Sequence, residues 1–508
     1  MDSHAAQSDQ PVSIRWGTPV ARGVLVTTIL GSGMAMLDGT VVNVALPRIG
    51  KELEASVAGL QWILDGYLLS LASLILIAGS LGDRYGRRKV YLIGIVWFGA
   101  CSLLCGLAPT TELLVAARVL QGVGGALLTP GSLAILQSSF ARADRARAIG
   151  AWSGLGGIAA AIGPLVGGLL VQAWSWRLAF LINVPIAIAC VWMARRFVPE
   201  SRDTQMTGKL DIGSSALGAI GLAGLTGALV EAPGQGIGSP FVIVAILLGV
   251  GGLTAFLVVQ HRSRDPLVPP EMFRDRTFSV ANALTFVVYT ALGGVMMLMV
   301  LQLQVSVGYS PTAAGVAGLP LTVIMLLTSS WSGRLASRIG PRLQLVVGPI
   351  VIAVGMLLYM RIGPGASYLT DVLPAVVVFG LGLTCVVAPV TATVLAAAED
   401  RHAGVASGIN NAVARTGGLL AVAVLPAVAG LTGDAYTDPT ALTSAWRTAL
   451  LICAVLAAVG GVIALGVRND VLSAPPKAEP EAPGPGDCLT CGVDGPPTHI
   501  RPAGPVAR

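Results

Sequence analysis

The sequence predicts an all-α membrane protein that crosses the bilayer many times. Hydrophobic residues make up 54% of the chain and charged residues only 11%, whereas a soluble domain carries roughly 25% charged residues. The 64 glycines favour the close helix packing found in membrane proteins. Such a chain has too little charge to cover a water-facing surface, so its apolar segments are expected to face lipid.

The apolar segments have the length that a membrane-spanning helix needs, which is about 20 residues. Fourteen of them follow one another along the chain. They run at about residues 22–46, 57–81, 88–108, 112–137, 147–172, 176–196, 212–232, 240–260, 276–305, 312–335, 342–362, 368–396, 403–430 and 446–467. The expected fold is therefore a polytopic bundle of fourteen transmembrane helices.

The basic residues between these segments predict the orientation, because cytoplasmic loops carry an excess of Lys and Arg. If the N-terminus is cytoplasmic, 25 of the 32 Lys and Arg residues fall on the cytoplasmic side. Both termini are then cytoplasmic. The net charge of +6 follows from this topology, so we expect no nucleic-acid partner.

The two ends of the chain lie outside the predicted bundle. Residues 1–21 form a short cytoplasmic segment, and residues 469–508 are rich in Pro, Gly and Ala, which predicts a disordered cytoplasmic tail. Within this tail, Cys488 and Cys491 are weak candidates for metal ligands. With only His499 nearby they make an incomplete zinc set, so we expect no metal site.

An internal repeat predicts how the helices are grouped. The ten residues from Gly79 match the ten residues from Gly333 at five positions, with a shift of 254 residues. Two related halves with a substrate site between them are typical of secondary transporters. The predicted halves cover residues 22–196 and 276–467, and the two helices within 212–260 are an insertion between them.

Four charged residues inside the predicted spans are candidates for a functional site: Asp38, Asp65, Arg118 and Arg415. Charged residues are costly in a bilayer and usually face a hydrated path or an opposite charge. Asp38, Asp65 and Arg118 each lie roughly 9–12 Å below the outer surface, and Arg415 roughly 18 Å from the cytoplasmic end of its helix. We expect the first three to form one polar cluster. The alternative is a fixed ion pair that only holds helices together.

Four segments carry recognisable motifs. Asp38 lies in the segment Leu37–Pro47, and Arg118 begins the segment Arg118–Pro130. The third motif is the loop after the second span, with Gly79, Gly82, Asp83, Arg84, Gly86, Arg87 and Arg88. The fourth is a glycine-rich stretch of the fifth span, with Gly154, Gly163, Pro164, Gly167 and Gly168. Together these segments resemble the fourteen-span drug:proton antiporters of the major facilitator superfamily.

The resemblance implies a role for each motif. Arg118 is implicated in proton transfer, and because arginine keeps its own proton it would act on a nearby carboxylate. Asp83 would hold the cytoplasmic side shut by meeting a helix end or an arginine of the other half. The glycines of the fifth span imply export. The alternatives are that the basic loop only sets the topology and that the glycines only permit close packing.

The sequence therefore predicts a proton-coupled antiporter that exports small hydrophobic or amphipathic drugs, antibiotics or secondary metabolites by alternating access. We expect a monomer in a bacterial inner membrane, whose partners are its substrate and the lipid bilayer and whose energy source is the proton gradient, without a cofactor. No catalytic constellation and no Walker sequence is present, so an enzyme is not expected. The alternatives are a proton-coupled symporter that takes up a nutrient and a non-transporting sensor.

Overall fold

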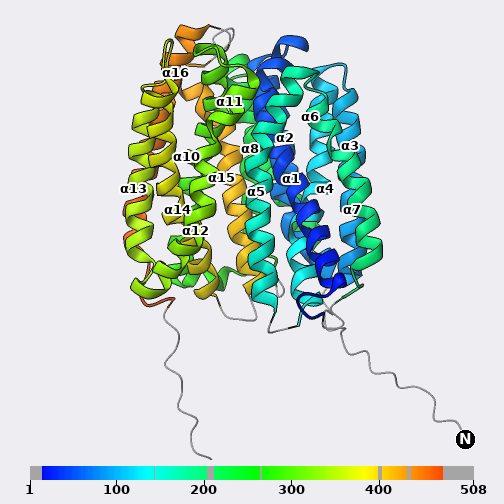
Figure 1. Ribbon diagram of the computed structural model, residues 1–508. Coiled ribbons are helices and arrows are strands. Elements are labelled where there is room, and N and C mark those ends of the chain that lie inside the picture. The colour runs from blue at the N-terminus through cyan, green and yellow to red at the C-terminus, as the bar shows by residue number, and fades with distance from the viewer. Residues whose placement is uncertain are drawn as a thin grey trace, which may run out of the picture. The chain divides into compact units, whose positions relative to one another are not determined.

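The computed structural model is a bundle of long helices that run side by side (Figure 1). It describes residues 14–472, except 142–143, 203–210, 264–265, 399–402, 432–435 and 437. Every named element among these residues is helical, which confirms the predicted all-α class. Of the predicted tail, residues 473–508, with Cys488 and Cys491, lie outside the described residues, whereas residues 469–472 are described.

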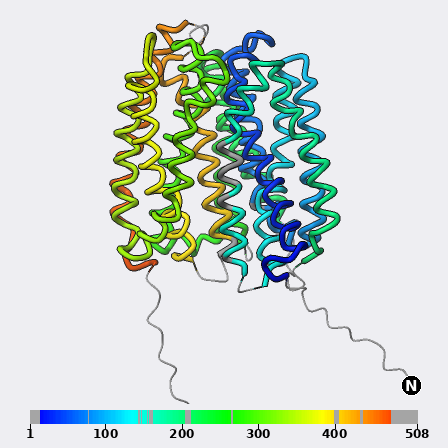
Figure 2. Tube along the Cα trace, viewed as in Figure 1, coloured from blue at the N-terminus to red at the C-terminus, as the bar shows by residue number. Residues whose placement is uncertain are grey.

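The first nine helices run from the N-terminal part of the chain to the middle, and Figure 2 lets the chain be followed through them. They are α1 (Pro19–Glu52), α2 (Val57–Tyr85), α3 (Arg87–Leu107), α4 (Thr111–Ser139), α5 (Arg145–Ala173), α6 (Leu178–Leu181), α7 (Asn183–Phe197), α8 (Ile212–Gln235) and α9 (Pro240–Arg262).

The remaining elements follow a short helical turn, η1 (Pro270–Arg274). They are α10 (Arg276–Leu301), η2 (Gln302–Ser306), α11 (Pro311–Ala317), α12 (Leu319–Ile339), α13 (Arg342–Tyr359), η3 (Tyr368–Val372), α14 (Leu373–Ala396), α15 (Ala403–Val428), α16 (Pro439–Ile463) and η6 (Ala464–Gly466).

Helix ends fall where the sequence supplies capping residues. The hydroxyl groups of Thr18, Ser56 and Thr110 each accept a hydrogen bond from the backbone N–H three residues later, as N-cap residues do. Gly86 and Gly340, which occupy matching positions in the internal repeat, end α2 and α12 with φ angles of 108° and 85°. Glycine adopts such angles without a steric penalty, so both copies of the repeat end their helix in the same way.

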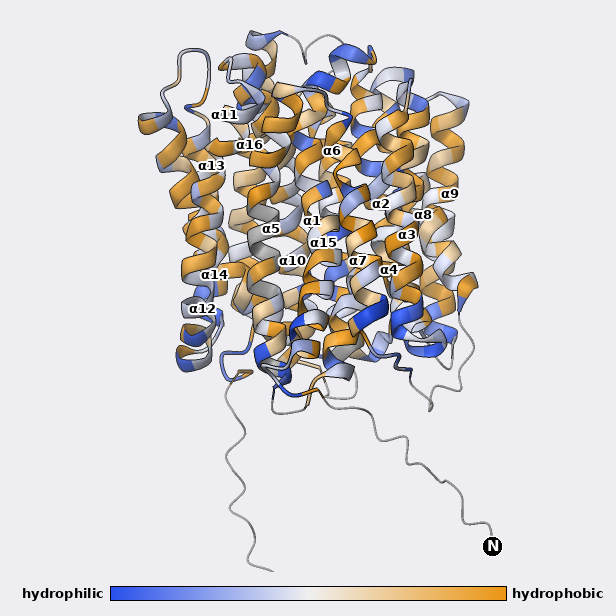
Figure 3. Ribbon diagram, turned by 45° about the vertical axis from the view of Figure 1, so that its right-hand side comes forward, coloured by the Kyte–Doolittle hydropathy of each residue, from blue (hydrophilic) through white to orange (hydrophobic). Residues whose placement is uncertain are grey.

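The membrane-spanning character of the helices is confirmed. Thirteen helices among the described residues are long and apolar enough to cross a bilayer. The fifth predicted span coincides with α5, of which the part Ile162–Ala173 is a shorter apolar helix, so the count of fourteen stays a prediction. Figure 3 shows apolar residues along the middle of the bundle and polar residues toward both ends of the helices.

Some predicted spans differ from the observed helices. The span predicted at 176–196 is broken at Ile182, between α6 and α7, and the one at 276–305 ends in the π-helical turn η2. The last span begins at Pro439 rather than at 446, because the Asp438 carboxylate caps the helix through the N–H of Thr440. Arg447, which falls at the edge of the predicted span, therefore lies well inside α16.

The two helices of the predicted insertion pack closely on each other. A side chain at Gly221 or Gly224 of α8, or at Gly249 or Gly252 of α9, would collide with the backbone of the opposite helix, so these small residues set the close approach. One of the pair, α8, contacts both α2 and α15. It therefore contacts both predicted halves. The division of the chain into two halves stays a prediction.

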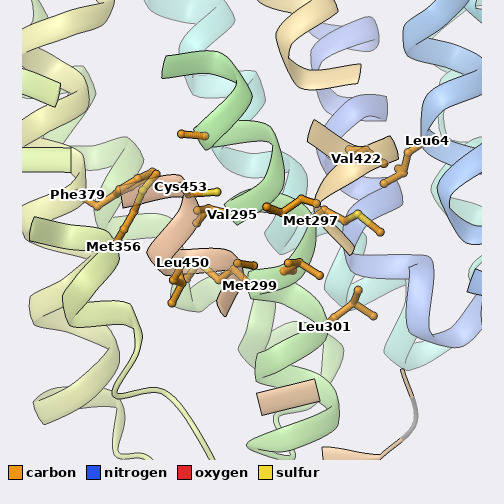
Figure 4. Close-up of a cluster of buried hydrophobic side chains, with 14 of the residues drawn as sticks. Leu64, Val295, Met297, Met299, Leu301, Met356, Phe379, Val422, Leu450 and Cys453 are labelled. Atoms are coloured by element: carbon orange, nitrogen blue, oxygen red, sulfur yellow. The ribbon is translucent and has the colours of Figure 1, made fainter. Parts of the chain in front are cut away.

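The largest apolar core joins helices from the beginning and the end of the chain. It contains Leu46 and Leu60 together with Val295 and Val422. Figure 4 shows Leu64 of α2 next to Val422 of α15. Apolar packing thus connects the two predicted halves directly.

The helix ends define two faces of the bundle. We call the face at which α1 begins and α2 ends the basic face, because Arg84, Arg87 and Arg88 lie there, and it is the face predicted to be cytoplasmic. The opposite face, at which α2 begins with Val57, is called the far face.

Candidate functional site

Asp38 of α1 and Arg118 of α4 form an ion pair inside the bundle. A guanidinium nitrogen of Arg118 lies 2.5 Å from Oδ2 of Asp38. The side chains are 0% and 1% exposed, so both charges are removed from water. A buried ion pair is stable only if its remaining donors and acceptors are also satisfied.

Three neutral side chains complete the hydrogen bonds of this pair. Gln121 Nε2 and Asn183 Nδ2 donate to Oδ1 of Asp38 at 2.9 and 3.0 Å, and both amides also donate to the hydroxyl of Ser102. The Gln121 carbonyl oxygen accepts from Arg118 at 2.7 Å. We call these five residues the Asp38–Arg118 cluster. It joins α1, α3, α4 and α7, and all five side chains are buried.

Aromatic and backbone groups hold the guanidinium in place. Arg118 Nε donates to the carbonyl oxygen of Ile63 at 3.0 Å, and the guanidinium lies 4.3 Å from the ring centre of Tyr67 and 5.7 Å from that of Phe180. A cation over an aromatic face is stabilised by the ring electrons, the more so when both are desolvated. The position of Arg118 is therefore fixed from α2 as well as from α1.

Asp65 does not join this cluster, which corrects the expectation of three charges in one place. Its side chain is 0% exposed, and neither carboxylate oxygen has a hydrogen-bond partner among the described residues. Tyr436, between α15 and α16, is near enough to feel the charge of Asp65. Burial, with a smaller contribution from Asp65, raises the pKa of Tyr436 well above its usual value.

Arg415 lies near the middle of α15, as the sequence predicts. In the described part of the chain its side chain makes no ion pair. It is close enough to Tyr67 of α2 and Tyr289 of α10 for its charge to act on both hydroxyl groups. Tyr67 thus has the Arg118 guanidinium over its ring and Arg415 in its surroundings.

The hydrogen bonds that connect the two predicted halves all lie near the far face, as far as the described residues show. Gln61 Nε2, in the second turn of α2, donates to the carbonyl oxygens of Val422 and Ala423 at 2.8 and 3.2 Å. Gln304 Nε2 donates to the carbonyl oxygen of Val44 at 3.0 Å. The bundle is therefore closed by direct contacts at the far face.

The glycine motif of α5 contributes to this closure. A Cβ added at Gly167 would lie 2.8 Å from the Val41 side chain of α1. A Cβ added at Gly168 would lie 2.6 Å from the carbonyl oxygen of Pro311 at the start of α11. Gly163 faces Thr40 of α1 in the same way. The motif thus lets α5 pack tightly between α1 and α11. Pro164 approaches α11 through its carbonyl oxygen, which lies against Gly315, whereas the surroundings of Gly154 fall outside the described residues.

The motif at the basic face makes contacts within its own half and with the link that follows it. Asp83 forms an ion pair with Arg87 at 2.8 Å across the turn between α2 and α3. Arg88 donates to the carbonyl oxygen of Val198 at 3.1 Å, and its backbone N–H donates to the carboxylate of Glu200 at 3.0 Å. In this structure Asp83 therefore pairs with a residue of its own turn, and among the described residues it forms no ion pair with the other half.

Replacing Asp83 by Ala is expected to slow transport more than it weakens substrate binding. The pair with Arg87 is partly exposed, and such pairs contribute only about 0–1 kcal/mol to stability, so the fold should be kept. A change at this turn would alter the balance between the two open states. Efflux rate and binding affinity, measured side by side, check this. The control is Asp470→Ala, which removes another exposed pair, with Arg468. A pure loss of affinity with unchanged turnover contradicts the prediction.

Several members of the Asp38–Arg118 cluster were not predicted. Asn183 and Ser102 lie in apolar runs of the sequence and carry no charge, so the distribution of charged residues does not indicate them. Asn183 could have been found as an amide inside the run Phe180–Ala189, because a polar side chain within a membrane helix usually has a partner.

The chain is similar in sequence to known proteins over most of its length. A family model described as the Major Facilitator Superfamily matches residues 28–209 and 192–422. A puromycin resistance protein of Streptomyces alboniger is 36% identical over 81% of this chain and 82% of its own length. A methylenomycin A resistance protein of Bacillus subtilis is 35% identical over 81% and 88%, and a tetracenomycin C resistance and export protein of Streptomyces glaucescens is 35% identical over 82% and 77%.

Solved structures show the same fold. A peptide transporter of the POT family superposes with a TM-score of 0.67 at 15% identity, over 90% of this chain and 95% of the other. A bacterial homologue of the lysosomal transporter Spinster, in an inward-facing conformation, superposes with a TM-score of 0.58 at 18% identity, over 90% and 96%.

These matches confirm a transporter rather than an enzyme, and they confirm the resemblance that the four motifs indicate. The model match covers more than half of the sequence, and relatives above 30% identity extend over about four-fifths of it. This membrane-spanning chain belongs to the Major Facilitator Superfamily.

Proposed function

We propose that this protein exports small apolar or amphipathic compounds, of the kind to which antibiotics belong, across a bacterial cytoplasmic membrane. The names of the relatives support this direction, since they are described as resistance or export proteins. The basic face is then cytoplasmic, and the far face, which is closed in this conformation, is the outer one.

The observation that carries the coupling to protons is the Asp38–Arg118 cluster. A carboxylate and a guanidinium are costly to bury in a membrane, even where, as here, they pair and accept or donate further hydrogen bonds. Protonation of Asp38 would neutralise the carboxylate and so break its ion pair with Arg118. We propose that loss of this pair loosens α1 and α4 against each other and so favours one of the two open states.

We propose that Asp65 is a second proton carrier. An ionised carboxylate without any donor or cation nearby is uncompensated in a low-dielectric environment, so the neutral acid fits this conformation better. When the far face opens, α2 separates from α15 and Asp65 becomes accessible to water. In that state Asp65 would take up a proton from the outside, and it would release this proton to the cytoplasm when the basic face is open.

Arg415 is proposed to line the substrate path. It lies at mid-membrane, close enough to Tyr67 and Tyr289 for its charge to act on both hydroxyl groups. Charged residues at this depth usually mark a path for substrates or ions. Together, the aromatic groups and the cation offer both apolar and polar contacts to an amphipathic compound.

The central test is Asp65→Asn, which is expected to reduce gradient-driven efflux at least tenfold while leaving the fold stable. Asn has the same shape, and since the Asp65 oxygens have no described hydrogen-bond partner, the change in unfolding free energy should stay below about 1 kcal/mol. Resistance of a pump-deficient host to puromycin, methylenomycin A and tetracenomycin C would be measured together with the melting temperature.

The control is Asp438→Asn, which also replaces an acid by its amide but at the start of α16, where the side chain caps a helix. It should leave efflux unchanged. Normal efflux driven by the proton gradient in the Asp65→Asn protein would contradict the proposed role of Asp65. Uptake rather than efflux by the unchanged protein would favour the symporter instead.

A further inference from the structure

A groove of about 500 Å³ lies at the basic-face end of α9, away from the Asp38–Arg118 cluster. The last turns of α9 form one wall. The segment that leads through Val268 and Pro270 to Phe273 folds back to form the other. The two walls are joined by a hydrogen bond of 2.9 Å from the N–H of Val268 to Oε1 of Gln260. The groove is therefore held in shape by a hydrogen bond between α9 and the link to α10.

The groove combines an apolar wall with one buried amide that lacks a partner. Gln260 is only 3% exposed, lines the groove, and its Nε2 has no hydrogen-bond partner among the described residues. Burying an amide donor without a hydrogen-bond partner costs free energy, so an acceptor that reached this nitrogen would be stabilising. His261 and Arg262 also line the groove and supply positive charge or further donors.

The positive charge at this end is not neutralised by the described acids. Arg262 makes no ion pair with a described residue. Asp275, the nearest acid after η1, is occupied as the N-cap of α10 through the N–H of Phe278. Glu271 is exposed and does not line the groove. The groove therefore suits an anionic acceptor.

The location of the groove identifies the kind of anion. α9 is the most apolar of the candidate spans, and only 22% of its most apolar stretch is buried inside the bundle. Beside the groove, Leu257 and Val258 are 65% and 43% exposed. A helix of 23 residues is about 34 Å long, which places its ends at the level of the lipid headgroups. The anion that matches this height and the apolar groups beside the groove is the phosphate of a lipid headgroup.

We propose that this groove binds the headgroup of an anionic phospholipid. The phosphate would pair with Arg262, with His261 at its edge, and would accept from Gln260 Nε2 once this buried amide turns toward the groove, while the acyl chains lie along Leu257, Val258 and Phe273. Basic pockets on the cytoplasmic side of membrane proteins bind such headgroups. The bound lipid would brace the link between the predicted insertion and α10.

The test measures lipids retained by the purified full-length protein, using native mass spectrometry after exchange into phosphatidylglycerol or phosphatidylcholine. We expect one tightly held phosphatidylglycerol, and about fivefold weaker retention in Arg262→Gln, the effect of one basic residue at a membrane surface. Gln260→Glu keeps the acceptor for Val268 but places a negative charge in the groove, and it should also expel the lipid. Arg274→Gln is the matched control, because Arg274 is basic and exposed but does not line the groove.

Three results would overturn the proposal. Equal retention of phosphatidylcholine would show that charge is not recognised. Equal losses in Arg262→Gln and Arg274→Gln would indicate a diffuse surface attraction. Displacement of phosphatidylglycerol by millimolar inorganic phosphate would make the groove a site for free phosphate rather than for a lipid. Transport by the same variants is read separately, so a failure of the export proposal leaves this test unaffected.

Discussion

The substitution Asp38→Asn is expected to abolish gradient-driven efflux, and it is the most damaging single change that the structure suggests. The amide can keep the hydrogen bonds from Gln121 or Asn183 only in part, and it leaves Arg118 buried without an anion. Removing one partner of a buried ion pair costs about 3–5 kcal/mol of stability. Efflux and the melting temperature would be measured on the same preparation.

A double variant separates the two possible roles of the pair. Asp38→Asn combined with Arg118→Gln removes both charges and relieves the unpaired guanidinium, so the melting temperature should recover toward that of the unchanged protein. Efflux should not recover, because no group is left whose protonation could break a pair. If the double variant pumps normally, the ion pair only holds helices together, which is the structural alternative for this motif.

Gly168→Val is expected to lower efflux at least tenfold by preventing closure at the far face. An added Cβ would lie 2.6 Å from the carbonyl oxygen of Pro311 and 2.7 Å from Cα of Thr312, and backbone at this distance cannot rotate away as a flexible side chain can. The two helices would be forced apart, so the conformation closed at the far face would be lost. Labelling of a Thr312→Cys variant by a membrane-impermeant maleimide should increase when Gly168→Val is added.

The matched control is Gly251→Val. Gly251 also lies in a membrane helix, but a Cβ added there would have no neighbouring atom within 4 Å. It should therefore pump and label like the unchanged protein. Efflux at the normal rate by the Gly168→Val protein, or unchanged labelling at Thr312, would show that α5 and α11 need not touch for transport.

The helices were predictable because membrane spans leave a strong signal in a single sequence. An uninterrupted run of about 20 apolar residues is rare outside membrane-spanning helices, and each run falls on observed helix, although some runs are interrupted, as at Ile182 between α6 and α7. At the start of the last span, polar residues are nonetheless helical. The start of α16 carries Thr440, Thr443 and Ser444, which are typical of a loop, although the Asp438 cap and tertiary contacts keep them in the helix.

The candidate site was predictable in part, for a geometric reason. Counting residues gives the depth of a side chain along its helix but not the direction in which it points. Asp38 and Arg118 face each other, whereas Asp65 lies at a similar depth and points elsewhere, so only two of the three expected charges meet. The direction depends on how the helices pack, which one sequence without contacts does not reveal. The pair of Asp83 with Arg87 is a local contact four residues apart, whereas the sequence predicts that Asp83 meets a helix end or the other half.

The position of α8 makes the two lateral seams of the transporter unequal. One seam runs between α2 and α15, and α8 contacts both of these helices, with the Trp62 indole N–H donating to Glu231 of α8 at 2.9 Å. The other seam involves α5 with α11 and α12, where no helix of the insertion is among the main contacts. A compound dissolved in the lipid would meet α8 at the first seam but could approach the second directly. The insertion thus gives the protein a covered side and an open side toward the membrane.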